Sequence, residues 1–396
     1  SGESPLISSS LTLESTTLGD QPLRFERDSL VVEDQALRLD LALRCGESDE
    51  VASIRGAVPF DPSSALNLQI ESHGDALNHL AALSGGSVKV QAGSSDLRLI
   101  LRGSLTQPVA NGFVVVSDGN ITVGEQSLSR INASLLFDFD RLELQRLEAR
   151  VGSDGSLRGA GSIGLLQEQT VESPLTFAFK KAKIRQEIAR YQVDGTVIVK
   201  GALARPKIGG ELSLSHGLIM PRSGGLAKAP KGGLRAGLLR ANEFSEPDDT
   251  SSEVSMTNLI EKKWDFKDPL VLMGPGTPLP ASQERLKNLM PNLPAVRFQN
   301  LRLVLGPDLE VKMTRLISFR GGGQLVLNGP LDPSLQVRGL IRLESGRVSL
   351  FTTTFILDSK ASNVAVFTPS LGLVPYVDVA MKARVSDGVS IGESDR

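Results

Sequence analysis

Two aspartates in the stretch FDFDRLEL, Asp138 and Asp140, have the type and spacing that could support catalysis. Side chains two positions apart on a strand lie on the same face, and two carboxylates on one face could hydrolyse a glycosidic bond. Acidic residues at this spacing more commonly form the solvent-facing side of an alternating strand, whose other side here carries Phe137 and Phe139. Both interpretations stay open, and the second is favoured.

The other residues that could do chemistry are few and scattered. His73, His79 and His216 do not stand at metal-ligand spacing from one another, and Cys45 is the single cysteine, so no disulfide framework or thiolate cluster can form within the chain. We expect Cys45 to be a buried, unreactive side chain. The RGGG stretch at 320–323 lacks the Gly-Lys-Ser/Thr that completes a phosphate-binding loop, and we interpret it as a turn.

Composition and patterning argue against catalysis and against nucleic-acid binding. No nucleophile can be paired with a base, and the glycosylation sequons at Asn120 and Asn132 are weak patterns. The net charge is −2 and aromatic residues make up 4% of the chain, so it lacks both the positive field and the stacking surfaces that bind nucleic acid. The sequence predicts a protein that is not an enzyme, with no cofactor, no metal site and no nucleic-acid partner.

A strand pattern with regular glycines recurs along the chain. Apolar residues stand three and five places before a glycine and again two places after it, around Asp118-Gly119, His216-Gly217 and Ser345-Gly346. Glycine readily supplies the positive φ that a two-residue hairpin needs, so we predict a hairpin turn at each dipeptide. A shorter form of the pattern covers 195–203 and 323–331. The side chains predicted to share one apolar face are Val114, Val116, Ile121, Val123, Val197, Val199, Leu212, Leu214, Ile219, Leu325, Leu327, Ile341, Leu343, Val348 and Leu350.

A second module precedes each of these dipeptides. Residues 103–112, 201–210 and 329–339 each begin with Gly-x-Leu, continue with a proline and end at another glycine. Glycine inside a strand marks a bulge or bend, and proline belongs at an edge or a connection. The module therefore predicts a strand that bends, leaves the sheet and returns beside itself.

Short helical patches accompany the strands, near 75–84 and 181–191, with a further patch at 282–290. Repeats of this kind predict an elongated all-β array rather than a globule.

We expect three parts: β repeats over 1–221, a mobile polar insertion over 222–256, and a C-terminal β segment over 257–396. No apolar run is long enough to cross a bilayer, so if the parent protein is anchored in a membrane, we expect the anchor outside these residues. The final residues, VSDGVSIGESDR, have a strand-like pattern, and we interpret the chain as a fragment.

The stretches VRFQNLRLVLGPDLEV and GGGQLVLNGPLDPSLQVRGLIRLESGRVSLFTTTFILDSKASNVAVFTPSLGLVPYVDV resemble the C-terminal part of the TamB family. This family of envelope proteins belongs to the AsmA-like group, and the sequence of these stretches is most similar to that of its cyanobacterial and chloroplast members. The resemblance covers about residues 295–385 and rests upstream on the repeat pattern alone. It implies a β-taco, a sheet folded lengthwise into a half-pipe with an apolar groove, for which the fifteen residues of the apolar face are the candidate lining.

What the resemblance implies for function is a bridge between two membranes. The parent protein would be anchored in the inner membrane, cross the periplasm or intermembrane space, and engage an Omp85-type barrel. Its groove would carry phospholipid acyl chains. The alternative is a scaffold or chaperone for outer-membrane protein assembly or protein translocation, acting through sheet edges. An extracellular β-helix would show uniform short rungs and a carboxylate cluster, and the sequence shows neither.

Overall fold

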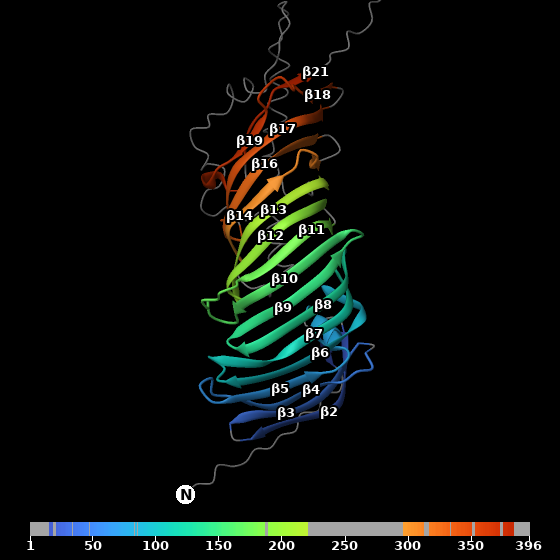
Figure 1. The fold of residues 1–396 in the computed structure, drawn as a ribbon, viewed down its shortest axis with the longest axis vertical. Coiled ribbons are helices and arrows are strands. Elements are labelled where there is room, and N and C mark those ends of the chain that lie inside the picture. Colours follow the sequence, from blue (N-terminus) through green and yellow to red (C-terminus); the bar gives the residue numbers. More distant parts are fainter. Residues whose placement is uncertain are drawn as a thin grey trace, which may run out of the picture. The chain divides into compact units, whose positions relative to one another are not determined.

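The computed structural model describes residues 16–220 and 296–383, apart from short gaps at 19–20, 34, 47, 83, 85, 187–188, 313–316, 333, 351–352 and 373–374. These residues form 21 strands, one α-helix and the short 3-10 helix η2 (Pro369–Leu371), so the predicted all-β class is confirmed (Figure 1). The strands divide into two compact units. Unit 1 holds the described residues up to Ser213 and the part of β14 up to Arg302, and unit 2 holds the remainder.

Unit 1 is a sheet in which each strand from β1 to β12 pairs antiparallel with the next along the chain. β12 and β13 are also neighbours, because a Cβ built on Gly195 would lie 2.2 Å from the carbonyl oxygen of Glu211. The strands are β1 (Thr16–Leu18), β2 (Gln21–Glu33), β3 (Ala36–Cys45), β4 (Ala52–Pro59), β5 (Leu66–Ser72), β6 (Val88–Gly103), β7 (Pro108–Val123), β8 (Gln126–Phe139), β9 (Arg141–Val151), β10 (Gly155–Gly164), β11 (Leu175–Gln186), β12 (Ala189–Ala202), β13 (Arg205–Ile219) and β14 (Arg297–Leu305), the last two continuing into unit 2.

Unit 2 is built around the long pair β16 and β17. β15 pairs with β16 and, in parallel, with the last residues of β13, while β17 pairs with both β18 and β19. β18 then pairs with β21, and β19 with β20. The strands are β15 (Glu310–Lys312), β16 (Ile317–Pro330), β17 (Gln336–Leu350), β18 (Thr353–Leu357), β19 (Val364–Phe367), β20 (Tyr376–Asp378) and β21 (Met381–Ala383).

The Gly-x-Leu modules form turns between consecutive strands. They connect β6 to β7, β12 to β13 and β16 to β17, and Gly103 lies directly opposite Pro108 in the register. The backbone at Gly103 has a φ of +91°, at Gly201 +86° and at Gly329 +100°, values that favour glycine. The prediction that the strand bends and returns beside itself is confirmed.

The three hairpin turns predicted at Asp118-Gly119, His216-Gly217 and Ser345-Gly346 are wrong. β7, β13 and β17 run on through these dipeptides, and the ladder instead shifts register there, as between Val116 and Gly119. Val116 and Ile121 are five positions apart, so an inserted residue is needed to put both on one face. A β-bulge does this as well as a turn would, and the chain already turns at the Gly-x-Leu modules.

Backbone N–H groups at the bulges are held by side chains of neighbouring segments. A bulge leaves a residue without its ladder partner, and an Asn or Asp oxygen can accept that N–H instead. Four residues with positive φ are held in this way: Asp118 N–H donates to Asn132 Oδ1 (3.2 Å), Arg130 to Asn120 Oδ1 (3.0 Å), Lys181 to Asp194 Oδ1 (2.7 Å) and His216 to Asp308 Oδ2 (3.0 Å). The two asparagines of the sequons therefore have a structural role.

We predict that Asn132→Ala lowers the free energy of unfolding by about 1–2 kcal/mol, because it removes two hydrogen bonds at a bulge. Urea unfolding followed by circular dichroism measures the change. Asn111→Ala is the matched control, since among the described residues the Asn111 side chain makes no hydrogen bond. Equal losses in the two variants would contradict the role given to Asn132.

The helical predictions divide into three outcomes. The helix α1 (Ala76–Ala82) lies within the expected 75–84. The helix expected at 181–191 is wrong, because β11 and β12 cover this stretch as an antiparallel pair in which Ile184 faces Tyr191. The patch at 282–290 and the insertion at 222–256 lie outside the described residues. Among the described residues, no helix combines the length and the apolar character that a bilayer crossing requires.

The RGGG stretch is also strand rather than turn. It lies inside β16, where a Cβ on Gly323 would come 2.1 Å from the carbonyl oxygen of Leu340 on β17. These glycines therefore permit a close approach of two strands.

Candidate functional site

The register of unit 1 gathers apolar side chains on one side of the sheet. Ile70 lies opposite Leu99, and Val114 lies opposite both Leu97 and Leu135. Because side chains alternate between the bulges, every second residue of each uninterrupted stretch belongs to this side. We call it the inner face of unit 1. Its members include Ile70, Leu97, Leu99, Val114, Val116, Leu135, Phe137, Leu144, Leu147, Leu157, Phe177 and Val199.

The opposite side, the outer face of unit 1, carries ion pairs between neighbouring strands. Glu71 and Arg98 are register partners next to the Ile70–Leu99 pair, with the carboxylate 3.1 Å from the guanidinium. Asp40 bridges in the same way to Arg27 (3.1 Å) and Arg55 (3.3 Å). The two faces of one sheet therefore differ sharply in chemistry.

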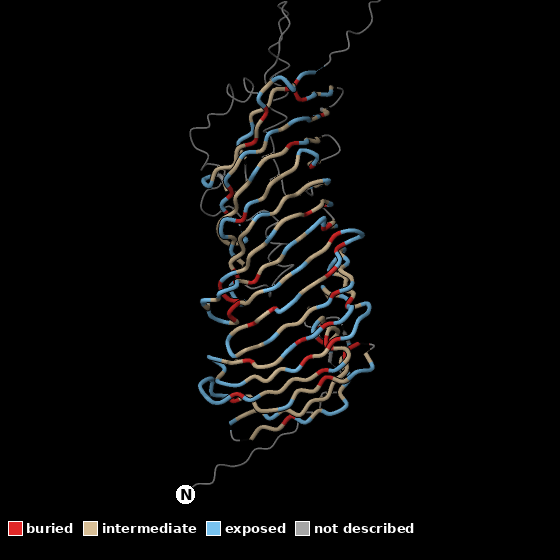
Figure 2. The backbone as a smooth tube through the Cα atoms, viewed as in Figure 1, coloured by how far each residue is buried: buried red, intermediate tan, exposed pale blue. Residues whose placement is uncertain are grey.

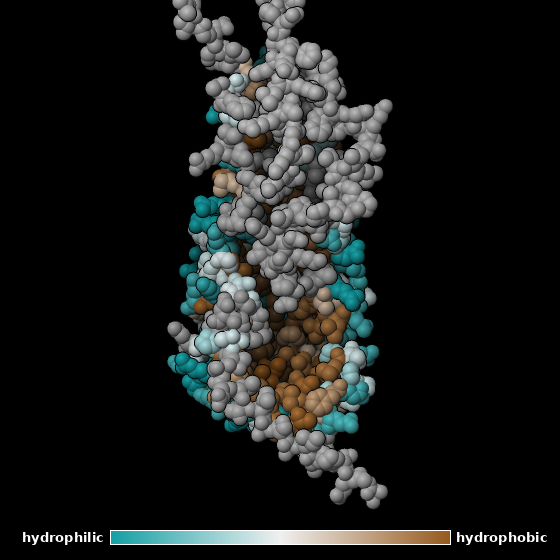
Figure 3. All heavy atoms as spheres, turned by 180° about the vertical axis from the view of Figure 1, so that it is seen from behind, coloured by the Kyte–Doolittle hydropathy of each residue, from teal (hydrophilic) through white to brown (hydrophobic). Residues whose placement is uncertain are grey.

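The inner face is hollowed and only partly covered. Along the tube, exposed residues recur between buried and half-buried ones, and strands such as β3 and β4 are half-buried over most of their length (Figure 2). Viewed from behind, the region where Figure 1 places β2 to β9 shows a concavity lined by hydrophobic residues (Figure 3). Leu99, Leu135 and Phe137 are half-buried rather than buried, so these side chains are accessible from the hollow.

Helix α1 covers one part of the inner face. Ala76 is fully buried against Leu97, Val114 and Val116, and Leu77 packs against the same cluster. Ser95 Oγ accepts a hydrogen bond from the Leu77 N–H at 2.6 Å, which ties the helix to β6. Helix α1 therefore covers the inner face of unit 1 around Leu97, Val114 and Val116.

The structure brings together several of the residues predicted for the apolar face of unit 1. Val114, Val116 and Ile121 share one cluster, and Val199 packs in the next. Val197 lies opposite Phe177 on the same side, and Leu212 is half-buried on β13. Val123 is the least enclosed, at 41% exposed beside the turn at Gly124.

The predicted residues of unit 2 form their own apolar side. Leu343 and Val348 pack together with Phe319, Leu357 and Met381. The remaining predicted residues there are half-buried, namely Leu214, Ile219, Leu325, Leu327 and Ile341, and the side chain of Leu350 lies outside the described residues.

The glycine pattern of the sequence did not identify most residues of the inner face of unit 1. Ile70, Leu99, Leu135, Phe137 and Phe177 are central to it but stand outside the glycine pattern. The signal that could have found them is plain alternation, as in LRLILRG and ASLLFDF, read without requiring a glycine.

The candidate catalytic residues do not form a site. Asp138 pairs with Arg141 at 3.1 Å, and Asp140 accepts a hydrogen bond from Gln169. β8 ends between them at Phe139, which has a φ of +56°, so they do not continue one strand face. In the described part of the chain, no three His, Cys, Asp or Glu side chains are grouped to hold a metal ion.

The structure corrects the expected location of His216 and shows the burial expected for Cys45. His216 was expected in a turn, but it lies inside β13 next to Asp308. Cys45 is buried as expected, and this burial raises the pKa of its thiol.

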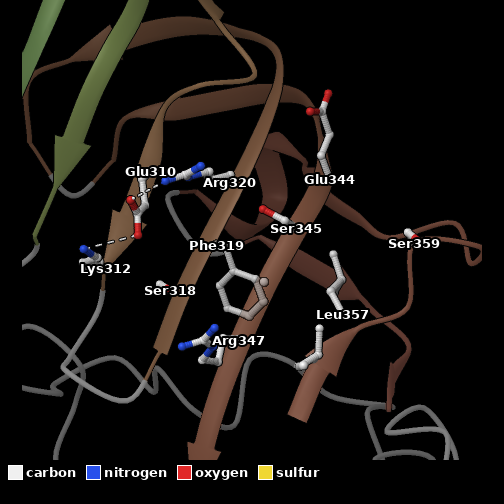
Figure 4. A pocket seen from close by; sticks show the side chains of 12 residues that line it. Glu310, Lys312, Ser318, Phe319, Arg320, Glu344, Ser345, Arg347, Leu357 and Ser359 are labelled. Atoms are coloured by element: carbon white, nitrogen blue, oxygen red, sulfur yellow. Dashed lines mark hydrogen bonds and ion pairs between the residues drawn. The ribbon is translucent and has the colours of Figure 1, made fainter. Parts of the chain in front are cut away.

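A pocket with a mostly polar and charged lining lies in unit 2, where it shares Phe319 and Leu357 with the apolar side (Figure 4). Glu310 pairs there with Lys312 (3.4 Å) and Arg320 (3.3 Å), and the Phe319 ring packs on Gly346, where a Cβ would meet it at 2.3 Å. Its charged lining does not suit an acyl chain, so the hollow of unit 1 is the stronger candidate for an apolar ligand.

Comparison with known proteins agrees with this architecture. Residues 145–396 match the TamB C-terminal domain. The chain is 26% identical over 301 residues to Protein TIC236, chloroplastic, of Arabidopsis thaliana, covering 73% of this chain and 14% of that protein. It is 27% identical over 329 residues to Protein SUBSTANDARD STARCH GRAIN 4, chloroplastic, of Oryza sativa subsp. japonica, covering 80% of this chain and 14% of that protein. No solved structure matches significantly. The family match extends over more than half of the chain, which therefore belongs to the TamB family.

Proposed function

We propose that this chain is a segment of an envelope bridge whose apolar inner face holds the acyl chains of phospholipids moving between two membranes. The hollow lined by half-buried Leu, Ile, Val and Phe side chains in unit 1 is the observation that carries the proposal (Figure 3). The apolar side of unit 2 is a second stretch of the same kind of surface. The proposal contains no catalytic step.

The energetics favour a lining of this kind. Exposing acyl chains to water costs about 0.8 kcal/mol per methylene, which amounts to about 20 kcal/mol or more for a two-chain lipid. An apolar wall that contacts the chains removes most of this cost while the headgroup stays in water. The outer face, with its ion pairs, remains solvated.

The chain supplies only part of such a bridge. It spans about 14% of the length of the curated relatives, so the complete path between membranes would need further segments. We place the parent protein in the periplasm or intermembrane space, anchored in the inner membrane and engaged with an Omp85-type barrel, in support of outer-membrane biogenesis. Family membership and the chloroplast relatives support this placement.

The proposal predicts that the purified chain extracts a fluorescent phospholipid from donor vesicles and delivers it to acceptor vesicles. We expect transfer at least about tenfold above the spontaneous rate, because the inner face lowers the cost of exposing acyl chains. Loss of donor quenching measures the rate. Transfer at the spontaneous rate, together with binding of unfolded barrel strands, would instead support a scaffold that acts through sheet edges.

A further inference from the structure

Five turns along one margin of unit 1 expose large apolar side chains. They follow β4, β6, β8, β10 and β12, and because successive strands are antiparallel these turns all lie at the same margin of the sheet. We call this margin the tip rim. The exposed side chains are Phe60 (57%), Leu105 (43%), Phe139 (59%), Leu166 (50%) and Leu203 (43%).

Backbone hydrogen bonds join the turns of the tip rim in two groups, those after β4 and β6 and those after β8, β10 and β12, and the strand ladder through β7 connects the two groups. Such bonds fix the spacing of the turns, so the exposed side chains form an ordered row. Four N–H groups donate to the carbonyl of a neighbouring turn or strand end: Phe60 to Gln35 (2.9 Å), Leu105 to Pro62 (3.1 Å), Leu165 to Asp140 (2.7 Å) and Leu203 to Gly164 (2.7 Å).

Folding does not explain why these positions are apolar. Turn tips usually carry Gly, Pro, Asn, Asp or Ser, and the exposed leucines contribute little to the core. The Gly-x-Leu module nevertheless repeats its leucine at Leu105 and Leu203, and again at Leu331 in unit 2, which is 54% exposed.

The opposite margin of unit 1 shows the contrast. Its turns after β3, β7 and β9 carry the acidic residues Asp49, Glu125 and Asp154. The large apolar side chains exposed there among the described residues are Leu80 (37%), on α1 in the connection after β5, and Val123 (41%), at the end of β7. The tip rim thus exposes a large apolar side chain at five successive turns, against two such side chains on the opposite margin, and this excess indicates a surface that is covered by a partner.

The dimensions of the row indicate the kind of partner. Five half-exposed Leu and Phe side chains offer roughly 400–500 Å², well below the ~800 Å² that each partner buries in a standard protein interface. Turns at every second strand are spaced about 9.6 Å apart. An α-helix advances about 10.5 Å in seven residues, so a helix with an apolar residue at every seventh position would meet one tip with each.

We propose that the tip rim binds a single amphipathic α-helix of a partner protein, laid along the margin with its apolar seam on Phe60, Leu105, Phe139, Leu166 and Leu203. The helix would cross the strands, since the row runs from the turn after β4 to the turn after β12. This surface is separate from the inner face, so its test is independent of lipid transfer.

Site-specific photo-crosslinking in the intact parent protein tests this surface. A benzophenone amino acid is placed at Leu105, Leu166 or Leu203, and the adducts are mapped by mass spectrometry. We expect adducts on one helical segment of a partner, at positions that move by about seven residues from one tip to the next. Phe113 and Val115, exposed at 39% and 36% on the outer face, serve as control positions and should give at least about fivefold less of that adduct.

The double variant L105S/L203S should lower the adduct yield at Leu166 at least about fivefold with only a small change in the thermal midpoint of unfolding, because these side chains are 43% exposed and lie outside the buried apolar clusters of unit 1. Adducts to the rim of a second copy, adducts to lipid, or no adduct above the Phe113 control would each overturn the proposal.

Discussion

Leu135→Asp is expected to reduce phospholipid transfer by this chain at least about tenfold. Leu135 lies opposite Val114 and Leu144 and packs with both apolar clusters of the inner face. A carboxylate there would have to lose water whenever an acyl chain passes, at a cost of about 2 kcal/mol or more, and 1.4 kcal/mol already corresponds to a tenfold change. The vesicle transfer assay measures the rate.

Leu136→Asp is the matched control because it makes the same change one residue further along β8. Leu136 is 36% exposed on the outer face, where it lies opposite Phe113 and Glu143, and its variant should keep transfer within about twofold. Circular dichroism must show that both variants are folded. Leu135→Trp adds a neutral variant that narrows the hollow and should also slow transfer. Folded Leu135 variants with normal transfer would contradict the assignment of the inner face.

Gly112→Ala is expected to lower the free energy of unfolding by more than about 3 kcal/mol. A Cβ on Gly112 would lie 2.0 Å from the carbonyl oxygen of Arg98 on β6, and the backbone there has a φ of +152°. The strands would have to separate locally and lose ladder hydrogen bonds worth about 1 kcal/mol each, in addition to the strain. Urea unfolding measures the change.

Gly124→Ala tests whether any glycine of β7 and its turn would have the same effect. Gly124 has a φ of +59°, and a Cβ at this position would meet no heavy atom within 4 Å, so only the cost of a left-handed backbone applies, about 1 kcal/mol. A loss at Gly112 no larger than the loss at Gly124 would show that β6 and β7 do not need the close approach.

Sequence reasoning was most successful where the signal is local. Alternation and regular glycines predicted an all-β chain, and the Gly-x-Leu modules predicted the points at which strands bend and return. It also put Leu343 and Val348 on one side, where they pack together. The predicted hairpin turn between them, at Ser345-Gly346, was wrong. A five-residue separation fits a bulge as well as a turn, and only the pairing with neighbouring strands distinguishes the two.

Other features depended on contacts that are distant in the sequence. Residues 184–191 have a helical spacing, but Ile184 and Tyr191 face each other across β11 and β12, so pairing within the sheet overrides the local preference. The glycines at 320–323 suggested a turn because nothing local shows that the backbone of β17 passes so close to them. The inner face was found only in part, since Leu135 and Phe177 stand outside the glycine pattern on which the prediction relied, and the register places them beside Val114 and Val197.

Photo-crosslinking at two neighbouring positions of β8 tests most directly whether the inner face holds lipid. A photoreactive amino acid is placed at Leu135, on the inner face, or at Leu136, on the outer face, in the parent protein within its native envelope. We predict phospholipid adducts at Leu135 at least about tenfold above those at Leu136. Equal adducts at the two positions, or adducts at Leu136 alone, would contradict the central claim.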